Sequence, residues 1–325
     1  MVAQRWVTYL KHDSRFGPNV RHMKLERGQV AVVTGAASGI GFALAEAFAK
    51  EGVNIVLADV EEGALAVAEA KIKAHSVETL AVTTDVRKVE SVEALLAASV
   101  AKFGRVHIVC NNAGVGGANV DPWTGPLSVL EWVIDVNFWG VMHGIRAFVP
   151  HFAANGGGYI VNTASIAGCM TGFSPIYDAS KHAVVAISDS LSWSMKEAGL
   201  PIGVSCLCPG WVRTGIVDSD RNWPEELGDK PVSDPAAQSI LDYGRKAISE
   251  GMTPAAVASM VLDAVQEDQF WVFPHQDFLD IAIARWDRIG ERINPEPPKQ
   301  LPGMPPRAQM IAELMRAMEQ AAKKG

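Results

Sequence analysis

From residue 29 onward, short apolar runs alternate with segments long enough to form helices, and this alternation constrains the fold more than any other feature of the sequence. The runs are apolar at nearly every position, which indicates strands buried on both faces of a parallel sheet. The expected strands span residues 29–34, 54–59, 79–85, 107–111, 159–165, 203–208 and 270–273, and the clearest helices between them span 40–50, 62–73 and 89–103.

Right-handed crossovers between parallel strands place helices on both faces of the sheet. We therefore predict an α/β, doubly wound parallel sheet (a Rossmann fold), whose ligand crevice lies at the carboxyl ends of the strands. The chain has 325 residues, of which 48% are hydrophobic, enough for a single large domain with terminal additions. We divide it into an N-terminal extension (1–27), a Rossmann-type domain (28–293) and a C-terminal tail (294–325).

The overall composition excludes several classes of protein. A net charge of −7 argues against a protein that binds nucleic acid, which would show a basic face. No apolar run is long enough for a membrane span. The four cysteines show no spacing typical of metal ligands, and we interpret them as buried, reduced thiols of a cytoplasmic protein without a metal: Cys110, Cys169, Cys206 and Cys208.

The two ends of the chain differ from the central part. The first 25 residues contain five basic side chains against one acidic side chain, without the apolar stretch of a secretory signal. We favour a flexible extension ahead of Met23 over an organellar transit peptide. Residues 294–306 are rich in proline and precede an amphipathic stretch, which we expect to dock on the body or on a neighbouring subunit; its apolar side contains Met310, Ile311, Leu314, Met315 and Met318.

A glycine-rich turn joins the first expected strand to the first helix, with the sequence Thr-Gly-Ala-Ala-Ser-Gly-Ile-Gly at 34–41. Glycine lets the backbone turn sharply and approach a pyrophosphate closely, and the helix amino terminus offers free N–H groups to the phosphates. Asp59 ends the second expected strand 24 residues after Gly35. A carboxylate there can accept both ribose hydroxyls of NAD and repels the 2′-phosphate of NADP. No lysine or arginine stands at 37–38 or 60–62, so the sequence predicts NAD rather than NADP.

The spacing Thr-Gly-x3-Gly-x-Gly resembles that of the classical short-chain dehydrogenase/reductase family, and three later motifs agree with it: Asp85-Val86, Asn111-Asn112-Ala113-Gly114 and Pro209-Gly210. The resemblance covers about residues 28–275. It implies that Asp85 and Val86 seat the adenine, and that Val212 and Thr214 hold the nicotinamide carboxamide. The complete set implied to bind the cofactor is Gly35, Ser38, Gly39, Ile40, Gly41, Asp59, Asp85, Val86, Asn112, Ala113, Gly114, Tyr177, Lys181, Pro209, Gly210, Val212 and Thr214.

Four residues match the catalytic tetrad of that family. Tyr177 and Lys181 stand four residues apart, on one face of an expected helix, and Ser165 ends the fifth expected strand. Asn137 lies in the helical stretch around Asn-Phe-Trp-Gly. The resemblance implies that Tyr177 is the acid or base, that Lys181 binds the nicotinamide ribose, that Ser165 polarises the substrate oxygen, and that Asn137 holds a water in a proton relay.

Hydride exchange with an alcohol requires a group that takes or gives the hydroxyl proton. A free tyrosine has a pKa of about 10, and a nearby lysine ammonium together with the positive nicotinamide ring lowers it. Taken singly, each of the four residues has an ordinary interpretation: Tyr177 as a packing residue, Lys181 as a solvated helix lysine, or Ser165 as a helix or turn cap. Their order behind a complete cofactor pattern favours catalysis, and we interpret the remaining titratable neighbours, His143 and His182, as structural.

The sequence thus predicts an NAD-dependent enzyme that interconverts a secondary alcohol and a ketone. Loops at 116–125, 166–175 and 211–242 are expected to select the substrate, and the last is long enough to act as a lid. Met170, Phe173 and Trp211 favour an apolar small molecule. A reductase of carrier-bound or CoA-linked acyl groups and a non-enzymatic NAD-binding protein stay open as alternatives. The resemblance also implies a homotetramer or homodimer assembled through helices near 125–153 and 175–198.

Overall fold

The structure of the protein is a computed structural model, which describes residues 23–117, 123, 125–230 and 235–322. For 235–241, 314 and 317–322 it describes the backbone alone. Most of the expected N-terminal extension therefore lies outside the described residues, as do the side chains of Leu314 and Met318 in the tail. Met23 and Leu25 do lie within them, and both pack against the core.

Seven parallel strands form one sheet: β1 (Val30–Thr34), β2 (Asn54–Asp59), β3 (Thr79–Thr83), β4 (Ile108–Asn111), β5 (Gly158–Thr163), β6 (Ile202–Leu207) and β7 (Trp271–Val272). Their order across the sheet is β3-β2-β1-β4-β5-β6-β7. The chain builds outward from β1 in one direction and then from β4 in the other, so a crevice opens between the carboxyl ends of β1 and β4. The predicted α/β, doubly wound parallel sheet is confirmed.

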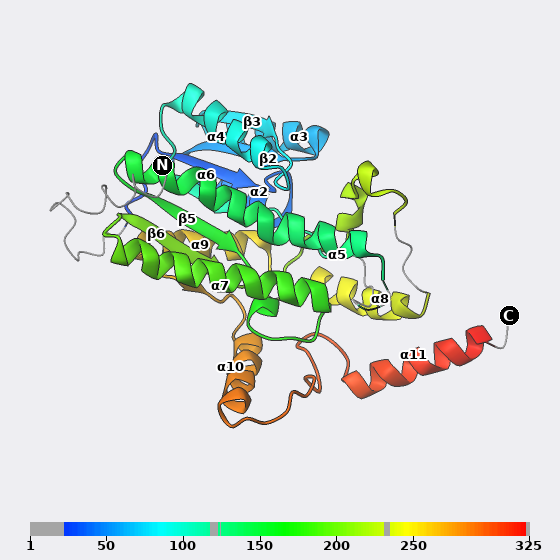
Figure 1. The fold of residues 1–325 in the computed structure, drawn as a ribbon. Helices are drawn as coiled ribbons and strands as arrows, with labels where there is room; N and C mark the ends of the chain where they lie inside the picture. The colour runs from blue at the N-terminus through cyan, green and yellow to red at the C-terminus, as the bar shows by residue number, and fades with distance from the viewer. Residues whose placement is uncertain (1–22, 118–122, 124, 231–234, 323–325) are drawn as a thin grey trace.

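Helices cover both faces of the sheet (Figure 1). In chain order they are α2 (Gly39–Lys50), α3 (Glu62–Lys73), α4 (Val89–Phe103), α5 (Leu127–Ile134), α6 (Gly140–Ala154), α7 (Pro175–Glu197), α8 (Pro235–Ser249), α9 (Pro254–Glu267), α10 (Gln276–Gly290) and α11 (Arg307–Ala322). Residues of α4, α6 and α7 share one apolar cluster, and residues of α2, α3 and α9 share a second cluster on the opposite face.

The central strand β1 shows why the fold has two cores. Val30 and Val32 belong to one apolar cluster, whereas Ala31 and Val33 belong to the other. Successive side chains of a strand point to opposite faces, and each of these four is at most 1% exposed. A strand that is apolar at every position therefore satisfies both layers of helices. This burial holds the carboxyl ends of the strands, where the site lies, in a fixed arrangement.

Some predicted boundaries are wrong by one or two residues at the ends of strands. Pairing of β3 ends at Thr83 and pairing of β5 ends at Thr163, so Asp85 and Ser165 lie in the turns that follow. Pairing of β6 likewise ends at Leu207, ahead of Pro209. The expected lid at 211–242 contains two short 3₁₀ turns, Ile216–Asn222 and Glu225–Leu227, but its last residues already belong to α8. Pro235 opens that helix, in keeping with the tolerance of a first helical turn for proline.

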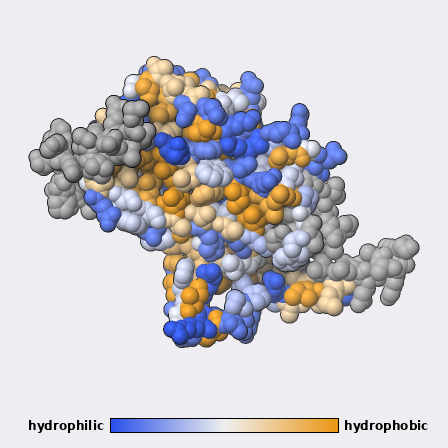
Figure 2. Space-filling model, in the orientation of Figure 1, coloured by the Kyte–Doolittle hydropathy of each residue, from blue (hydrophilic) through white to orange (hydrophobic). Residues whose placement is uncertain are grey.

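The C-terminal part of the chain forms α10, a proline-rich connection and α11, which runs away from the body (Figure 1). Exposed apolar side chains lie on both helices, as the orange areas at the foot of the molecule and at the start of α11 show in Figure 2: Ile283, Trp286, Ile289, Ile311 and Met315. The Tyr243 hydroxyl of α8 donates to the Glu313 carboxylate of α11. The predicted amphipathic stretch is thus a helix that contacts the body through α8.

All four cysteines are free and buried, in agreement with the prediction of reduced thiols. Among the described residues, none of the helices combines the length and the apolar character needed to cross a membrane. Within the same residues, no cluster of His, Cys, Asp or Glu side chains has an arrangement suited to a metal ion.

Candidate active site

A cavity of about 1250 Å³ lies at the carboxyl ends of the strands. Each of the residues predicted to bind the cofactor lines it, from Gly35 in the glycine turn to Thr214 beyond β6. Ser165 lines it as well, whereas Asn137 lies behind its wall and is completely buried. The fold thus places residues that follow several different strands around one cavity, which confirms that they are neighbours.

The glycine turn is packed too tightly for other residues. Gly35 has a φ of +66°, and a Cβ on it would lie 2.9 Å from the Cα of Ala113. A Cβ on Gly41 would overlap the carbonyl oxygen of Gly35. The Ser38 hydroxyl, at the start of α2, makes no capping hydrogen bond with the helix. The turn therefore presents a closely approachable backbone and an uncapped helix amino terminus, which fit the pyrophosphate of a dinucleotide.

The turn after β4 is fastened to the end of β1. The Thr34 hydroxyl accepts hydrogen bonds from the backbone N–H groups of Asn112 (2.9 Å) and Ala113 (3.1 Å). The Asn112 side chain donates in return to the carbonyl of Thr34 at 3.0 Å. These bonds hold the two strands together at the switch point of the sheet, where the cofactor crevice opens.

Asp59 lies at the end of β2 and faces the same crevice. One carboxylate oxygen accepts from the backbone of Ala37 at 2.9 Å, and the other accepts from the backbone of Glu61 at 3.1 Å. The carboxylate therefore joins the glycine turn to the turn after β2 and is held in place from both sides. Each oxygen retains a lone pair for a further donor, such as a ribose hydroxyl.

An arginine that local sequence could not place contacts the turn after β2. Arg221, 160 residues beyond Glu61, donates to the Glu61 carboxylate with two nitrogens, at 2.7 and 3.0 Å. Asn222 donates to the same oxygen at 2.8 Å. We call residues 216–227 the lid segment; these bonds tie it to the turn after β2, and several of its residues line the cavity.

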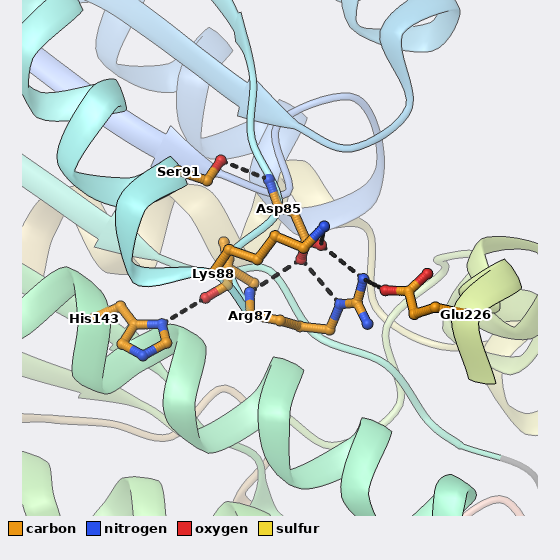
Figure 3. A network of polar contacts seen from close by, with 7 residues as sticks. Asp85, Arg87, Lys88, Ser91, His143 and Glu226 are labelled. Carbon is orange, nitrogen blue, oxygen red and sulfur yellow. Dashed lines mark hydrogen bonds and ion pairs between the residues drawn. The ribbon is translucent and has the colours of Figure 1, made fainter.

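A second ion pair fixes the far end of the lid segment (Figure 3). Arg87, in the turn after β3, binds Glu226 of the lid segment at 2.9 Å and the Asp85 carboxylate at 2.7 Å. Although burial alone would raise the pKa of Asp85, the hydrogen bonds from Arg87 hold it below its usual value. The Asp85 carboxylate, which was expected to face the adenine, is thus engaged by Arg87. His143 contacts the carbonyl of Val86 at 2.9 Å, in keeping with the structural role predicted for it.

Tyr177 and Lys181 lie one turn apart near the start of α7, as predicted. The Lys181 ammonium is 5.8 Å from the centre of the Tyr177 ring and donates to the carbonyl of Thr163 at 3.0 Å. Burial raises the pKa of Tyr177 to about 12, against a hydrogen bond with Ser165 that lowers it. Burial lowers the pKa of Lys181 to about 8. Burial thus opposes the lowering of the Tyr177 pKa that we expected from the lysine charge.

Ser165 and Asn137 complete the group. Ser165 caps the short turn Ile166–Gly168, where its hydroxyl accepts from the backbone of Ala167 at 3.1 Å and donates to the carbonyl of Pro209 at 3.4 Å. Asn137 lies in the π-helical turn Asp135–Trp139 between α5 and α6. Its side chain donates to the hydroxyl of Ser180 on α7 at 3.1 Å. The helix that carries Tyr177 and Lys181 is therefore bonded to the helix that carries Asn137.

The cavity wall around Phe173 and Trp211 contains apolar residues and includes part of the C-terminal tail. The rings of Phe173 and Trp211 meet edge to face with centroids 5.3 Å apart. The Trp211 indole donates to the carbonyl of Pro302 at 2.7 Å. Four further apolar residues of the tail line the cavity: Leu301, Met304, Met310 and Ile311. The three loops expected to select the substrate do not include this wall, because no local pattern indicates that residues 295–311 return to the cavity.

The turn after β6 is held by a residue that sequence reasoning also missed. His275 Nδ1 accepts from the backbone N–H of Gly210 at 3.0 Å, and Nε2 donates to the carbonyl of Trp211 at 3.0 Å. Burial lowers the pKa of His275, which favours the neutral ring that this pair of bonds requires. His275 thus fixes the backbone next to the residues expected to hold the nicotinamide.

The family of the chain follows from its match to a known family model. The family model described as short chain dehydrogenase matches residues 29–225, which is more than half of the chain. The protein belongs to the short-chain dehydrogenase family. It is an oxidoreductase with a nicotinamide cofactor, and the resemblance drawn from its motifs is confirmed.

Similar proteins agree with this assignment. The chain is 34% identical to 1-deoxy-11-beta-hydroxypentalenate dehydrogenase of Streptomyces exfoliatus over 83% of its own length and 91% of that protein. It is 34% identical to 3beta-hydroxysteroid dehydrogenase 2 of Eggerthella lenta over 64% of its length and 80% of that protein. A short-chain dehydrogenase/reductase of Burkholderia phymatum, solved in complex with NAD, is 39% identical, with a TM-score of 0.83 and coverage of 86% of this chain and 100% of that one.

Proposed function

We propose that the protein is an NAD(H)-dependent dehydrogenase that interconverts a secondary alcohol and its ketone, with Tyr177 as the acid or base. The observation that carries this proposal is the meeting of Tyr177, Lys181 and Ser165 in the same cavity as the glycine turn and Asp59. One half of the cavity suits a dinucleotide, and the other half brings a proton-transfer group to the apolar space beside it.

The contacts of these residues suggest a separate role for each of them. When bound, the nicotinamide takes up or delivers the hydride. Tyr177, as the phenolate, accepts the hydroxyl proton when the alcohol is oxidised and returns a proton to the oxygen when the ketone is reduced. The charges of Lys181 and of the oxidised nicotinamide oppose the effect of burial on the Tyr177 pKa. Ser165, which lines the same cavity as Tyr177, orients the substrate oxygen. Asn137 holds the surrounding helices in position.

The preference for NAD rests on the charges around the adenosine ribose. Asp59 is directed into the crevice, and Glu61 stands two residues later. Arg221, which could otherwise receive a 2′-phosphate, is paired with Glu61. The 2′-phosphate of NADP would therefore meet two carboxylates and a cation that is already neutralised, which favours NAD.

The apolar wall formed by Phe173, Trp211 and the tail supports an apolar substrate of one or more rings. One relative, 3beta-hydroxysteroid dehydrogenase 2 of Eggerthella lenta, is named for a steroid, which is an apolar compound with several rings. Trp139 and Trp193 are 44% and 50% exposed on the helices expected to pair subunits, which supports the proposed homodimer or homotetramer. The four free cysteines support a reducing, cytoplasmic location.

A panel of cyclic secondary alcohols and ketones, followed through the absorbance of NADH or NADPH, tests this proposal. We expect oxidation or reduction of at least one ring compound, with a higher kcat/KM for NAD(H) than for NADP(H). Absence of turnover across the panel with both cofactors would overturn the proposed reaction, and a preference for NADP(H) would overturn the role given to Asp59 and Glu61.

A further inference from the structure

The turn after β6, residues 209–212, lines the same cavity as the catalytic candidates. Strand β6 pairs with β5, which leads to Ser165, whereas three strands separate β6 from β2, which ends at Asp59. The Ser165 hydroxyl donates to the carbonyl of Pro209 in this turn at 3.4 Å. The turn therefore lies next to a residue expected to act on the substrate oxygen and away from the residue expected to bind the adenosine ribose.

A histidine from the C-terminal part of the chain holds this turn by two hydrogen bonds. His275, immediately before α10, contacts the N–H of Gly210 through Nδ1 and the carbonyl of Trp211 through Nε2, both at 3.0 Å. A backbone N–H only donates, so Nδ1 is the acceptor and the proton of the neutral ring lies on Nε2. One imidazole thus binds two consecutive residues and restricts rotation of the peptide unit between them.

The two bonds differ in what their loss would leave behind. The Trp211 carbonyl also accepts from the backbone N–H of Met252 at 3.0 Å, so it keeps a partner without His275. Among the described residues, Nδ1 of His275 is the one acceptor of the Gly210 N–H. Loss of Nδ1 would therefore leave a donor of the cavity wall without a protein partner, which loss of Nε2 would not do.

The packing around Gly210 gives the turn little room to change shape. A Cβ at this position would lie 2.7 Å from the Phe278 ring and 3.1 Å from Cγ of His275, so the start of α10 packs directly against the backbone. Phe278 is 1% exposed, and its ring meets the Trp211 ring edge to face with centroids 5.9 Å apart. The contacts and the hydrogen bonds from α10 therefore act on the same two residues.

We propose that His275 is a positioning residue for the nicotinamide half of the cofactor. It acts through the backbone of Gly210 and Trp211, and its Nδ1 acceptor carries most of the effect. The inference rests on the proposed function, because it takes the cofactor to be NAD(H) with its nicotinamide beside the turn 209–212.

Two ligands separate a local effect of His275 from a general one. NADH and ADP-ribose share the adenosine, the pyrophosphate and the second ribose, and they differ by the nicotinamide. In His275→Leu we expect the Kd of NADH to rise at least about fivefold, as for one lost hydrogen bond, and the Kd of ADP-ribose to stay within about twofold. Isothermal titration calorimetry measures both without turnover. An equal rise for the two ligands, or no rise for NADH, would overturn the positioning role.

Two conservative variants assign the effect to Nδ1. In His275→Asn the side-chain oxygen takes the place of the Nδ1 acceptor, and in His275→Gln the amide nitrogen takes the place of the Nε2 donor. We expect His275→Asn to bind NADH within about twofold of the unaltered protein, and His275→Gln to show a rise in Kd of about fivefold. The reverse order would overturn the assignment to Nδ1. This comparison stands even if His275→Leu does not fold.

The chain offers a matched control at the opposite edge of the sheet. His107 Nδ1 accepts from the N–H of Val30 at 3.1 Å, which is the same kind of bond at the amino end of β1. His107→Leu should leave the Kd of NADH within about twofold of its original value. A rise as large as that in His275→Leu would show a general loosening of the fold and would overturn the local role.

Failure of this inference is distinguishable from failure of the proposed function. The unaltered protein is first titrated with NADH and with NADPH. If it prefers NADPH, the proposed preference for NAD fails, and the same variants are compared with NADPH and 2′-phospho-ADP-ribose, for which the expectation for His275 is unchanged. If NADH is preferred and the His275 variants show no selective loss of NADH, the inference fails and the proposed function stands.

Discussion

The side chain of Asn137 and the backbone of Val115 hydrogen-bond to each other in both directions. Asn137 Oδ1 accepts from the Val115 N–H at 2.8 Å, and Nδ2 donates to the Val115 carbonyl at 3.0 Å. Nδ2 also donates to the hydroxyl of Ser180. The amide thus joins three segments, the turn after β4, the π-helical turn and α7, and its contacts support a positioning role for the Asn137 side chain.

Replacing Asn137 with alanine should therefore destabilise the fold as well as reduce turnover. The change leaves the backbone groups of Val115 buried without partners, which should cost about 2 kcal/mol or more of the free energy of unfolding. Urea denaturation measures this. Asn155→Ala, at the exposed end of α6, is the control and should cost less than about 1 kcal/mol. Equal stability of the Asn137 variant and the unaltered protein would contradict the positioning role.

The ion pair between Arg221 and Glu61 should slow the release of the cofactor. Arg221→Met frees one end of the lid segment, and the rate of NADH dissociation should rise severalfold at low salt, because an exposed ion pair contributes up to about 1 kcal/mol. Stopped-flow fluorescence measures this rate. Lys50→Met, which removes an exposed pair on α2, is the matched control. A dissociation rate unaffected by Arg221→Met would show that the lid segment does not retain the cofactor.

The C-terminal tail should act on the substrate and not on the cofactor. A chain ending at residue 293 loses the hydrogen bond from Trp211 to Pro302 and the apolar wall that follows. We expect kcat/KM for ring substrates to fall at least about tenfold while the affinity for NADH, measured by fluorescence titration, stays within about twofold. Trp211→Phe, which keeps an aromatic ring but removes the indole donor and part of the ring volume, should show a smaller fall. An unchanged kcat/KM in the shortened chain would exclude the tail from the substrate site.

Asp178 should make stability depend on pH in a recognisable way. Its folded-state pKa of about 6 lies above the ordinary value of 3.8, mainly because of burial, although hydrogen bonds from the backbone N–H groups of Gly172 and Phe173 oppose the rise. Between these values the folded state binds more protons, so stability is lost as pH rises from about 4 to about 6. Asp178→Asn should remove this loss and stabilise the protein at pH 7 by an amount on the order of 2 kcal/mol.

Denaturation of the variant and the unaltered protein at several pH values gives the difference between them directly. Asp189→Asn, exposed on the same helix, should show a constant difference across the range. If the difference for Asp178→Asn is constant between pH 4 and pH 7 as well, Asp178 does not carry the raised pKa.

Local patterns were sufficient for the features that depend on neighbours in the sequence. The strand Asn54–Asp59 and the helix Val89–Phe103 were predicted to the residue, because apolar runs and helical spacing are set by the segment itself. That Tyr177 and Lys181 are neighbours likewise follows from their spacing of four residues, about one helical turn. The resemblance added Ser165 and Asn137, which the fold does bring to the same region.

Features that depend on distant segments could not be predicted in this way. Nothing around Arg221 indicates a partner 160 residues earlier, and nothing in α10 indicates that Arg285 faces the cavity. Asp178 was interpreted only as a position within the motif 177–181, and nothing in that motif indicates that its side chain is buried with an oxygen that has no hydrogen-bond partner. Such properties arise only when the crossovers and the tail are placed in space.

Turnover by Tyr177→Phe tests the central claim most directly. The variant loses the hydroxyl that exchanges the proton and keeps the ring that packs beside Lys181. We predict an unchanged fold by circular dichroism, an affinity for NADH within about threefold of the original, and a kcat lowered at least about 10³-fold on any substrate found in the panel. A variant that folds, binds NADH and retains more than a tenth of the original kcat would contradict the role of Tyr177.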